Sequence, residues 1–285
     1  MPDIRFQIWG CRGGRNTFGS RIGNLTSCYS LRVGSDLFVF DAGRGLVSLA
    51  EAVFASAGGV SRVHVLVTHA HMDHWEGLKD ASWFWRRQNG IDLTIIGPAE
   101  ALDAIRRAHE PPSFVELEVL GNGTLAKLSI VEIAANAQMA LPGATLRAIA
   151  LHHYSGAAPN QIPLDTLGYQ LVVDGGPTVT YLSDHEPTIA THAMESELFA
   201  ASQLVVVDAN YGAISEHAFG HGSIENAAVR AREHPSTFVL AGHHGPLRTD
   251  AAIEAAHQRE GCANLIMAIE GVALRWDGGA ARFIV

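Results

Sequence analysis

The stretch Thr-His-Ala-His-Met-Asp-His at positions 68–74 constrains this chain more than any other feature. It follows an apolar run that is typical of a buried β-strand, and a helical pattern follows it. His69 and His71 are two residues apart, so an extended backbone directs both side chains the same way. Asp73 and His74 stand where the chain turns, and they reach a second point nearby. The stretch therefore predicts ligands for two metal ions, with zinc preferred over manganese or iron for these donors.

Three later residues share one feature with this stretch, because each follows an apolar strand-like run. They are His153, Asp184 and His243. If those strands end on one rim of the fold, all three side chains converge on the same cleft. Two of the three stand in doublets, His152-His153 and His243-His244, and the residue order alone leaves the choice within each doublet open.

Composition excludes several classes of protein. The 285 residues are 47% hydrophobic, enough for a large core, and the formal net charge of −9 argues against a protein that coats nucleic acid non-specifically. Cys11, Cys28 and Cys262 are too few and too scattered for a disulfide framework, which favours reduced thiols in a cytoplasmic protein. We expect no membrane span, because no apolar run approaches ~20 residues. We expect no signal peptide, because the residues Met-Pro-Asp-Ile-Arg at the start are not a basic region followed by an apolar one.

Apolar periodicity predicts alternating strands and helices along the whole chain. We expect strands at 4–9, 24–33, 36–40, 63–67, 93–96, 167–173, 178–182, 204–207, 238–240, 265–269 and 272–276, with several short ones within 114–150. We expect helices at 45–57, 75–88, 99–108, 186–200, 223–233 and 250–259, with Ser223 as an N-cap. Because several connections read as hairpins, the pattern favours two mixed sheets packed face to face, helices outside, and one domain over residues 1–285. The aromatic group Trp83-Phe84-Trp85 is expected in the core or a dimer contact.

The pattern His-x-His-x-Asp-His resembles the signature of the metallo-β-lactamase superfamily. That resemblance implies an α/β fold, the four-layer αββα sandwich of two mixed sheets flanked by helices. It also implies how the ligands divide between two metals. His69, His71 and His153 would bind the first metal, Asp73, His74 and His243 the second, and Asp184 would bridge them. The family pattern favours His153 over His152 and His243 over His244.

A second motif narrows the resemblance to one branch. Aspartate at the bridging position, rather than cysteine, differs from the antibiotic-hydrolysing branch. The segment Phe219-Gly220-His221-Gly222-Ser223 is similar to the Gly-His-Ser/Thr segment of ribonuclease Z-like and phosphonate-pathway cyclic phosphodiesterase-like proteins. The histidine of that segment helps to stabilise or protonate the departing oxygen, so the resemblance gives this role to His221.

The resemblance implies a hydrolase with two Zn²⁺, or Mn²⁺ or Fe²⁺ in their place, most simply a phosphodiesterase acting on a small or cyclic phosphodiester. A hydroxide bridging the metals would attack phosphorus, with Asp73 or Asp184 orienting it. Loop arginines Arg12, Arg15 or Arg21 would hold the phosphoryl oxygens.

Two alternative functions and two partner expectations accompany this interpretation. The same site suits a carbonyl hydrolase acting on a lactone, thioester or β-lactam, and a metal-stabilised binding or sensor protein without catalysis. Transfer RNA is not favoured as a partner, because the chain has no lysine-rich arm and its only lysines are Lys79 and Lys127. A homodimer is expected from the family alone.

Overall fold

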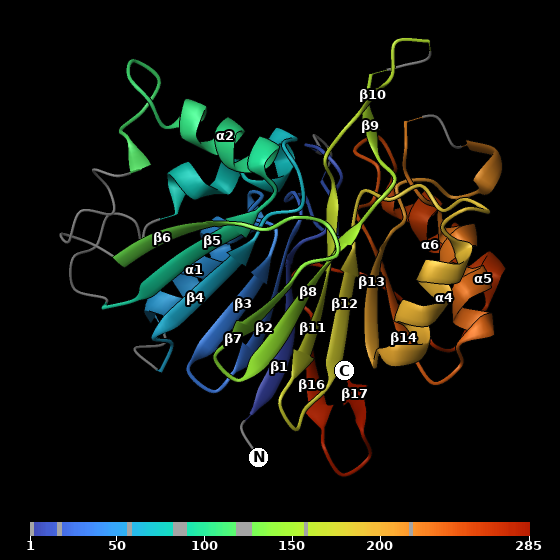
Figure 1. The fold of residues 1–285 in the computed structure, drawn as a ribbon. Coiled ribbons are helices and arrows are strands. Elements are labelled where there is room, and N and C mark those ends of the chain that lie inside the picture. Colours follow the sequence, from blue (N-terminus) through green and yellow to red (C-terminus); the bar gives the residue numbers. More distant parts are fainter. Residues whose placement is uncertain are drawn as a thin grey trace.

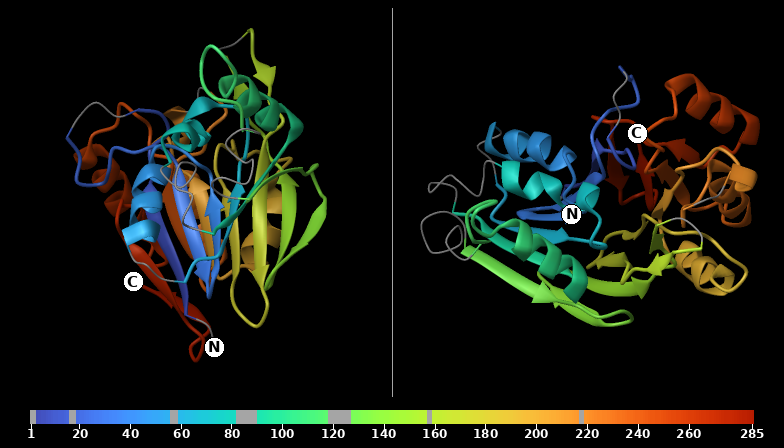
Figure 2. Two further views of the ribbon diagram at one scale, coloured as in Figure 1. Left: turned by 90° about the vertical axis from the view of Figure 1, so that its left-hand side faces the viewer. Right: turned by 90° about the horizontal axis from the view of Figure 1, so that it is seen from above.

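Two large β-sheets lie face to face, and helices cover the outer face of each (Figure 1). This arrangement comes from a computed structural model that describes residues 3–15, 19–55, 59–81, 90–117, 127–156, 159–216 and 219–285. Figure 2 shows the two sheets edge-on, with their helices on opposite sides. The predicted αββα sandwich of two mixed sheets is therefore confirmed.

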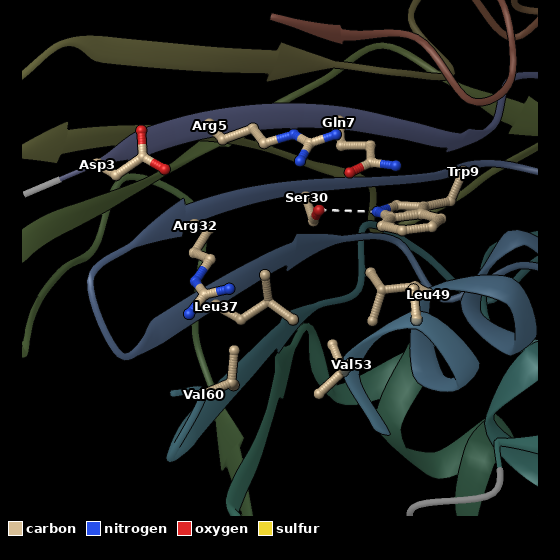
Figure 3. A pocket seen from close by; sticks show the side chains of 11 residues that line it. Asp3, Arg5, Gln7, Trp9, Ser30, Arg32, Leu37, Leu49, Val53 and Val60 are labelled. Atoms are coloured by element: carbon tan, nitrogen blue, oxygen red, sulfur yellow. Dashed lines mark hydrogen bonds between the residues drawn. The ribbon is translucent and has the colours of Figure 1, made fainter. Parts of the chain in front are cut away.

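The first sheet has eight strands in the order β17-β16-β1-β2-β3-β4-β5-β6. Its strands are β1 (Ile4–Gly10), β2 (Cys28–Val33), β3 (Asp36–Phe40), β4 (Arg62–Leu66), β5 (Asp92–Gly97), β6 (Lys127–Glu132), β16 (Ala273–Asp277) and β17 (Arg282–Ile284). On its outer side lie α1 (Gly45–Ala55) and α2 (Ala99–Ala108). Helix α1 borders a groove on the β1–β2–β3 surface, whose lining side chains are drawn in Figure 3.

The second sheet has seven strands in the order β15-β14-β13-β12-β11-β8-β7. Its strands are β7 (Gln138–Leu141), β8 (Ala144–Ala150), β11 (Leu167–Val173), β12 (Thr178–Leu182), β13 (Leu204–Asp208), β14 (Phe238–Gly242) and β15 (Leu265–Met267). Helices α4 (His192–Ala201), α5 (Ile224–Glu233) and α6 (Asp250–Glu260) cover it, and a short pair, β9 (Tyr154–Ser155) and β10 (Ile162–Pro163), projects beyond it.

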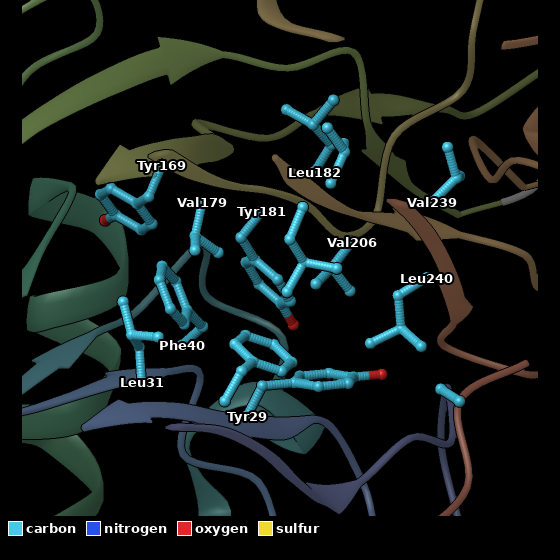
Figure 4. Close-up of a cluster of buried hydrophobic side chains, with 14 of the residues drawn as sticks. Tyr29, Leu31, Phe40, Tyr169, Val179, Tyr181, Leu182, Val206, Val239 and Leu240 are labelled. Carbon is cyan, nitrogen blue, oxygen red and sulfur yellow. The ribbon is translucent and has the colours of Figure 1, made fainter. Parts of the chain in front are cut away.

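The core lies between the sheets because alternate residues of each strand point inward. On β1 the buried residues Ile4, Phe6 and Ile8 alternate with more exposed ones. Aromatic rings from both sheets meet in the middle: the Phe40 ring centroid is 5.4 Å from that of Tyr181 (Figure 4). Tyr181 contacts Tyr29 as well, at 5.5 Å. Contacts of this kind, rather than a single helix or hairpin, join the two sheets.

Strand direction brings many carboxyl ends to one rim. Strands β3, β4, β5 and β6 run parallel, and so do β12, β13, β14 and β15. Strand β8 is antiparallel to β11, which is antiparallel to β12, so β8 ends on the same side as β12. Ligands in mixed α/β sheets bind beyond the carboxyl ends of parallel strands. The fold thus presents one rim as the place for a site.

Several predicted elements match the structure, and others differ for physical reasons. Helix α2 and strands β11 and β12 have the predicted bounds, and the Ser223 hydroxyl caps α5 by accepting from the Asn226 N–H. The predicted helix at 75–88 is wrong where it is described, because residues 76–80 form a 3₁₀ turn, η2 (Glu76–Asp80). There the Gly77 N–H bonds the Ala42 carbonyl, and this tertiary contact overrides helical pattern.

Other predicted features lie at changed positions or outside the described residues. The helix predicted at 186–200 begins at His192, because Pro187 and a hydrogen-bonded Thr188–Thr191 turn precede it. Strands β9, β10 and β17 were not predicted. The aromatic group Trp83-Phe84-Trp85 lies outside the described residues. In the described part of the chain, every helix is too short or too polar to cross a membrane.

The inter-sheet aromatic contacts give a test of the core. Phe40→Ala should lower the free energy of unfolding by about 3–5 kcal/mol, because a fully buried ring is lost from a packed interior. Urea unfolding in the presence of a chelator would measure this without a contribution from bound metal. Val172→Ala, at a 42% exposed position on β11, should cost less than about 1 kcal/mol. Equal losses in the two variants would contradict the assigned core.

Candidate metal centre

The predicted ligands all follow the carboxyl ends of strands that meet at one rim. His69 comes three residues after β4, His153 three after β8, Asp184 two after β12, and His243 directly after β14. The remaining three, His71, Asp73 and His74, lie in or next to η1 (Met72–His74). The structure therefore brings the seven residues together, while their role as ligands stays a prediction.

One group consists of three histidines and a carboxylate. His69, His71, His153 and Asp184 each offer a donor atom, and the four atoms lie within 4.8 Å of one another. His153 Nε2 is 3.2 Å from His71 Nδ1 and 3.5 Å from Asp184 Oδ2. Donors about 2.0–2.1 Å from a tetrahedral zinc lie about 3.3 Å apart, so these spacings suit a metal of that size.

A second group consists of Asp73, His74 and His243, whose donor atoms also lie within 4.8 Å of one another. His74 Nε2 is 3.6 Å from Asp73 Oδ2. The Asp73 side chain is partly exposed, and its Oδ2 accepts the backbone N–H of Gly14 at 3.0 Å. Each group thus has one partly buried member, Asp73 here and His71 in the first group.

The carboxylate of Asp184 lies between the two groups, and each oxygen faces one of them. Oδ2 is 3.6 Å from His69 Nε2 and 3.5 Å from His153 Nε2. Oδ1 is 3.2 Å from His74 Nε2 and 3.0 Å from His243 Nδ1. Burial alone would raise the pKa of Asp184, but His243 and His74 outweigh it and hold the pKa well below its usual value. Asp184 is thus a buried, ionised carboxylate with a separate set of donors at each oxygen.

Oxygen partners fix the orientation of the histidine rings. The Nδ1 atom of His69 is 2.9 Å from Thr68 Oγ1, and that of His153 is 2.9 Å from the Gly220 carbonyl. His74 Nδ1 lies 2.7 Å from Asp41 Oδ2. With Nδ1 occupied in this way, Nε2 of His69 and His153 is left to carry the lone pair, which is how carboxylates and carbonyls orient histidine toward a metal. Burial lowers the pKa of His74, but Asp184, Asp41 and Asp73 outweigh it and raise the pKa, so a metal bound there would displace a proton.

Two of these Nε2 atoms are buried without a hydrogen bond within the described structure, those of His69 and His74. A buried polar atom without a partner is rare, because it loses about 1–3 kcal/mol of solvation. Burial lowers the pKa of His69 well below its usual value and that of His153 to about 4, so both rings are neutral donors at pH 7. The residues present therefore fit divalent metal ions.

Asp41 is a hydrogen-bond partner of the candidate ligand His74, a role that the sequence did not reveal although the segment Asp41-Ala42-Gly43 resembles the ribonuclease Z-like branch. Its fully buried carboxylate accepts the Thr68 N–H at 2.9 Å and the Tyr181 hydroxyl at 2.8 Å, in addition to its contact with His74. Asp41 comes directly after β3. It therefore shows the same pattern as the other candidate residues, a ligand-type side chain after an apolar strand. Asp41 thereby joins both sheets to the ligand loop.

Sharp backbone turns accompany these strand ends. Asp41, Asp184 and His243 have φ values of 58°, 54° and 52°, a left-handed conformation that is uncommon for residues other than glycine. Such residues cluster at functional sites, where the surrounding structure holds them in place. A Cβ on Gly13 would lie 2.4 Å from the His243 ring, so only glycine permits the loop after β1 to pass this close.

His221 lies beside both groups and is paired with a second residue that the sequence analysis missed. Its Nδ1 is 2.6 Å from Oδ2 of Asp208, which ends β13, and its ring centroid is 4.9 Å from that of His153. Burial lowers the pKa of His221, but Asp208 outweighs this effect and raises the pKa to about 9. Asp208 thus favours the protonated form of His221.

The two histidine doublets are resolved by position. The His152 side chain is 50% exposed and points to Glu186, whereas His153 belongs to the buried group. His244 is buried away from the other donors, with Nε2 3.2 Å from the Ala268 carbonyl. The structure thus places His153 and His243 among the donors, as the family pattern favoured.

The loop arginines expected to hold a substrate differ in burial. Arg12 is fully buried, and its guanidinium bonds the Gly23 carbonyl and the Asp250 carboxylate, which ties loops together. The Arg21 guanidinium bonds Glu254 on α6 at 2.8 Å. The expectation is therefore wrong for Arg12, because its buried guanidinium is bonded to protein acceptors. For Arg21, whose side chain is 79% exposed, it stays a prediction. Arg15 is exposed.

Removal of the Asp41 charge tests whether this carboxylate orients His74 toward a metal. Asp41→Asn should weaken zinc binding by about 10–100-fold, because His74 loses the carboxylate that orients it. Competition with a chromophoric chelator would measure the affinity. The matched control Asp103→Asn, at an exposed position on α2, should bind zinc like the unaltered protein. Unchanged affinity in Asp41→Asn would contradict this role.

Comparison with known proteins agrees with this architecture. The Beta-lactamase superfamily domain matches residues 37–258. Ribonuclease Z of Mycobacterium marinum is 39% identical over 85 residues, which cover 27% of this chain and only 30% of that protein. The chain therefore matches less than a third of this curated relative.

Solved structures resemble the whole chain. The metallo-beta-lactamase fold protein YhfI from Bacillus subtilis has a TM-score of 0.69 at 16% identity, covering 96% of this chain and 100% of its own. A diphosphatase from the PhnP family has a TM-score of 0.65 at 15% identity, covering 96% of this chain and 98% of its own. At such low identity these likenesses concern the fold. The family match covers most of the chain, and we conclude that this protein belongs to the beta-lactamase superfamily and has the metallo-beta-lactamase fold.

Proposed function

We propose that this protein is a two-metal hydrolase that cleaves small phosphodiesters. The observation that carries the proposal is the position of Asp184, with one oxygen facing His69 and His153 and the other facing His74 and His243. A single buried carboxylate between two donor groups is the arrangement that a pair of cations needs. His69, His71 and His153 would hold one ion, Asp73, His74 and His243 the other, and Asp184 both.

Zinc suits this donor set best, because imidazole nitrogen and carboxylate oxygen are its usual ligands together with cysteine sulfur. When bound, two such cations lower the pKa of a water molecule and neutralise charge on phosphoryl oxygens. The carboxylate of Asp73, partly exposed at the edge of the cleft, would orient the attacking water.

The His221–Asp208 pair favours phosphorus chemistry with a poor leaving group. Water forms the new bond to phosphorus and gives one proton to the Asp73 carboxylate, the bond from phosphorus to the alcohol oxygen breaks, and His221 gives that oxygen its proton. Asp208 holds Nδ1 of His221 at 2.6 Å, which fixes the ring and keeps it charged. General acid catalysis of this kind typically contributes ~10²–10⁴-fold.

A small substrate is favoured over RNA by the charge of the chain. The formal net charge of −9 disfavours binding of a long polyanion, and the chain has no lysine-rich arm, because its only lysines are Lys79 and Lys127. The ribonuclease Z relative makes RNA the alternative substrate, and the substrate panel below includes an RNA.

The proposal is tested by metal analysis combined with a substrate panel. Purified protein should contain about two zinc ions per chain and hydrolyse bis(p-nitrophenyl) phosphate, a chromogenic phosphodiester. A lactone, a β-lactam and a precursor transfer RNA assayed side by side should turn over much more slowly. Turnover of the carbonyl substrates alone, or of the RNA alone, would contradict the proposal. Full metal loading without any turnover would favour a binding or sensor protein.

His221→Ala tests the proton donor. It should keep both metals but slow cleavage of an alkyl phosphodiester by about 10²-fold or more, with a smaller loss on a p-nitrophenyl ester, whose leaving oxygen needs no proton. Rates on the two esters and metal content would be measured together. His152→Ala, which removes an exposed histidine beside the same loop, is the matched control. An equal loss on both esters would rule out the acid role.

A further inference from the structure

The outer face of the eight-stranded sheet carries a row of arginines on three adjacent strands. Arg5 on β1 is the register partner of Arg275 on β16 and, on its other side, of Arg32 on β2. Directly opposed side chains on one face have Cβ atoms about 4.5–5.5 Å apart, and like charges at that spacing destabilise a sheet. Arg32 donates from its Nε to the Gly34 carbonyl at 3.1 Å, so part of its guanidinium is engaged, while its charge still lies next to that of Arg5.

The row borders a groove of about 320 Å³ between the sheet and α1. Alternation on β1 directs Ile4, Phe6 and Ile8 into the core, so Arg5, Gln7 and Trp9 face outward into this groove. In Figure 3 the Arg5 and Arg32 side chains lie on neighbouring strands along one side, and the Trp9 indole closes one end. A volume of this size is within the usual range for small-molecule sites.

The groove has one apolar wall and a fixed aromatic side chain. Helix α1 contributes Leu49 and Val53, and Leu37 and Val60 line the sheet side. The Trp9 N–H donates to the Ser30 hydroxyl at 2.8 Å, which holds the indole in place and leaves its ring for stacking. The groove thus has guanidinium groups on one side and apolar and aromatic side chains on the other.

The charges in the groove select the sign of a ligand. Among the described residues that line it, Asp3 is the only acidic one, against Arg5 and Arg32. Guanidinium groups suit carboxylate, sulfonate and phosphate heads, because they present paired N–H donors in a plane. A positively charged groove is unusual on a chain whose formal net charge is −9.

We propose that this groove binds a small organic anion, with its charged head at Arg5 and Arg32 and its aromatic or aliphatic body against Trp9, Leu49 and Val53. Binding neutralises the repulsion between neighbouring arginines and covers the apolar wall of α1. The site is separate from the metal centre, since none of its lining residues belongs to the ligand groups.

Calorimetric titration with 1-naphthalenesulfonate tests the site, because this probe has a single anionic head and a flat apolar body. One molecule should bind per chain. Arg5→Gln and Arg32→Gln should each weaken binding about tenfold, and the double variant should abolish it. Arg107→Gln, which removes the same charge from an exposed position on α2, should leave the affinity unchanged. Sodium sulfate and 1-naphthol should each bind far more weakly than the complete probe.

Two further measurements distinguish binding in the groove from binding at the metal centre or at scattered surface arginines. His71→Ala should bind the probe as tightly as the unaltered protein, and a loss there would place the probe at the metal centre and overturn the proposal. Thermal melts of the ligand-free protein should show an equal or higher midpoint for Arg5→Gln, because a like-charge contact is removed. The groove site is also contradicted if the probe fails to bind, or if Arg107→Gln loses as much affinity as Arg5→Gln.

Discussion

One buried carboxylate, that of Asp184, is the interaction on which the rim of this fold depends. An ionised carboxylate taken out of water loses several kcal/mol of solvation unless partners surround it. Here the partners come from both sheets: His69 and His74 follow β4 of the first sheet, and His153 and His243 follow β8 and β14 of the second. The carboxylate therefore links the two halves of the sandwich at the place where their strands end.

The candidate ligands lie in irregular segments that follow the strands. The packed strands of the sandwich hold these segments in place. Aromatic packing between Phe40 and Tyr181 fixes the sheets, and the Tyr181 hydroxyl continues that contact to Asp41 at 2.8 Å. From there the chain turns through left-handed residues that an isolated peptide would avoid, at about 1–2 kcal/mol each. The strain is sustained because buried hydrogen bonds on every side determine the position of these residues.

Local signals explain which parts of this structure could be predicted. A ligand-type residue after an apolar strand needs no knowledge of the rest of the chain, and it identified His153, Asp184 and His243 as candidates at one rim. Asp41 and Asp208 also stand at strand ends, but each acts by binding Nδ1 of a histidine, His74 or His221. Those are tertiary contacts, which the local pattern does not show. Arg12 shows the opposite failure, because a glycine-rich loop has the same pattern whether its arginine is exposed or buried. The prediction of a helix at 75–88 was wrong for residues 76–80, where the Gly77 N–H bonds the Ala42 carbonyl and the chain forms a 3₁₀ turn.

Acidic and basic side chains are concentrated at different places in this molecule, which the net charge alone does not show. Four carboxylates, those of Asp41, Asp73, Asp184 and Asp208, gather at the rim. The rings of His69 and His153 beside them are neutral, so the carboxylates favour a cation at this place. On the outer face of the first sheet the balance is reversed, with arginines on three adjacent strands. Interactions between charges fall off over about 8–10 Å in physiological salt, so each place acts by its local groups. An acidic chain can therefore attract cations at its rim and anions on its outer face.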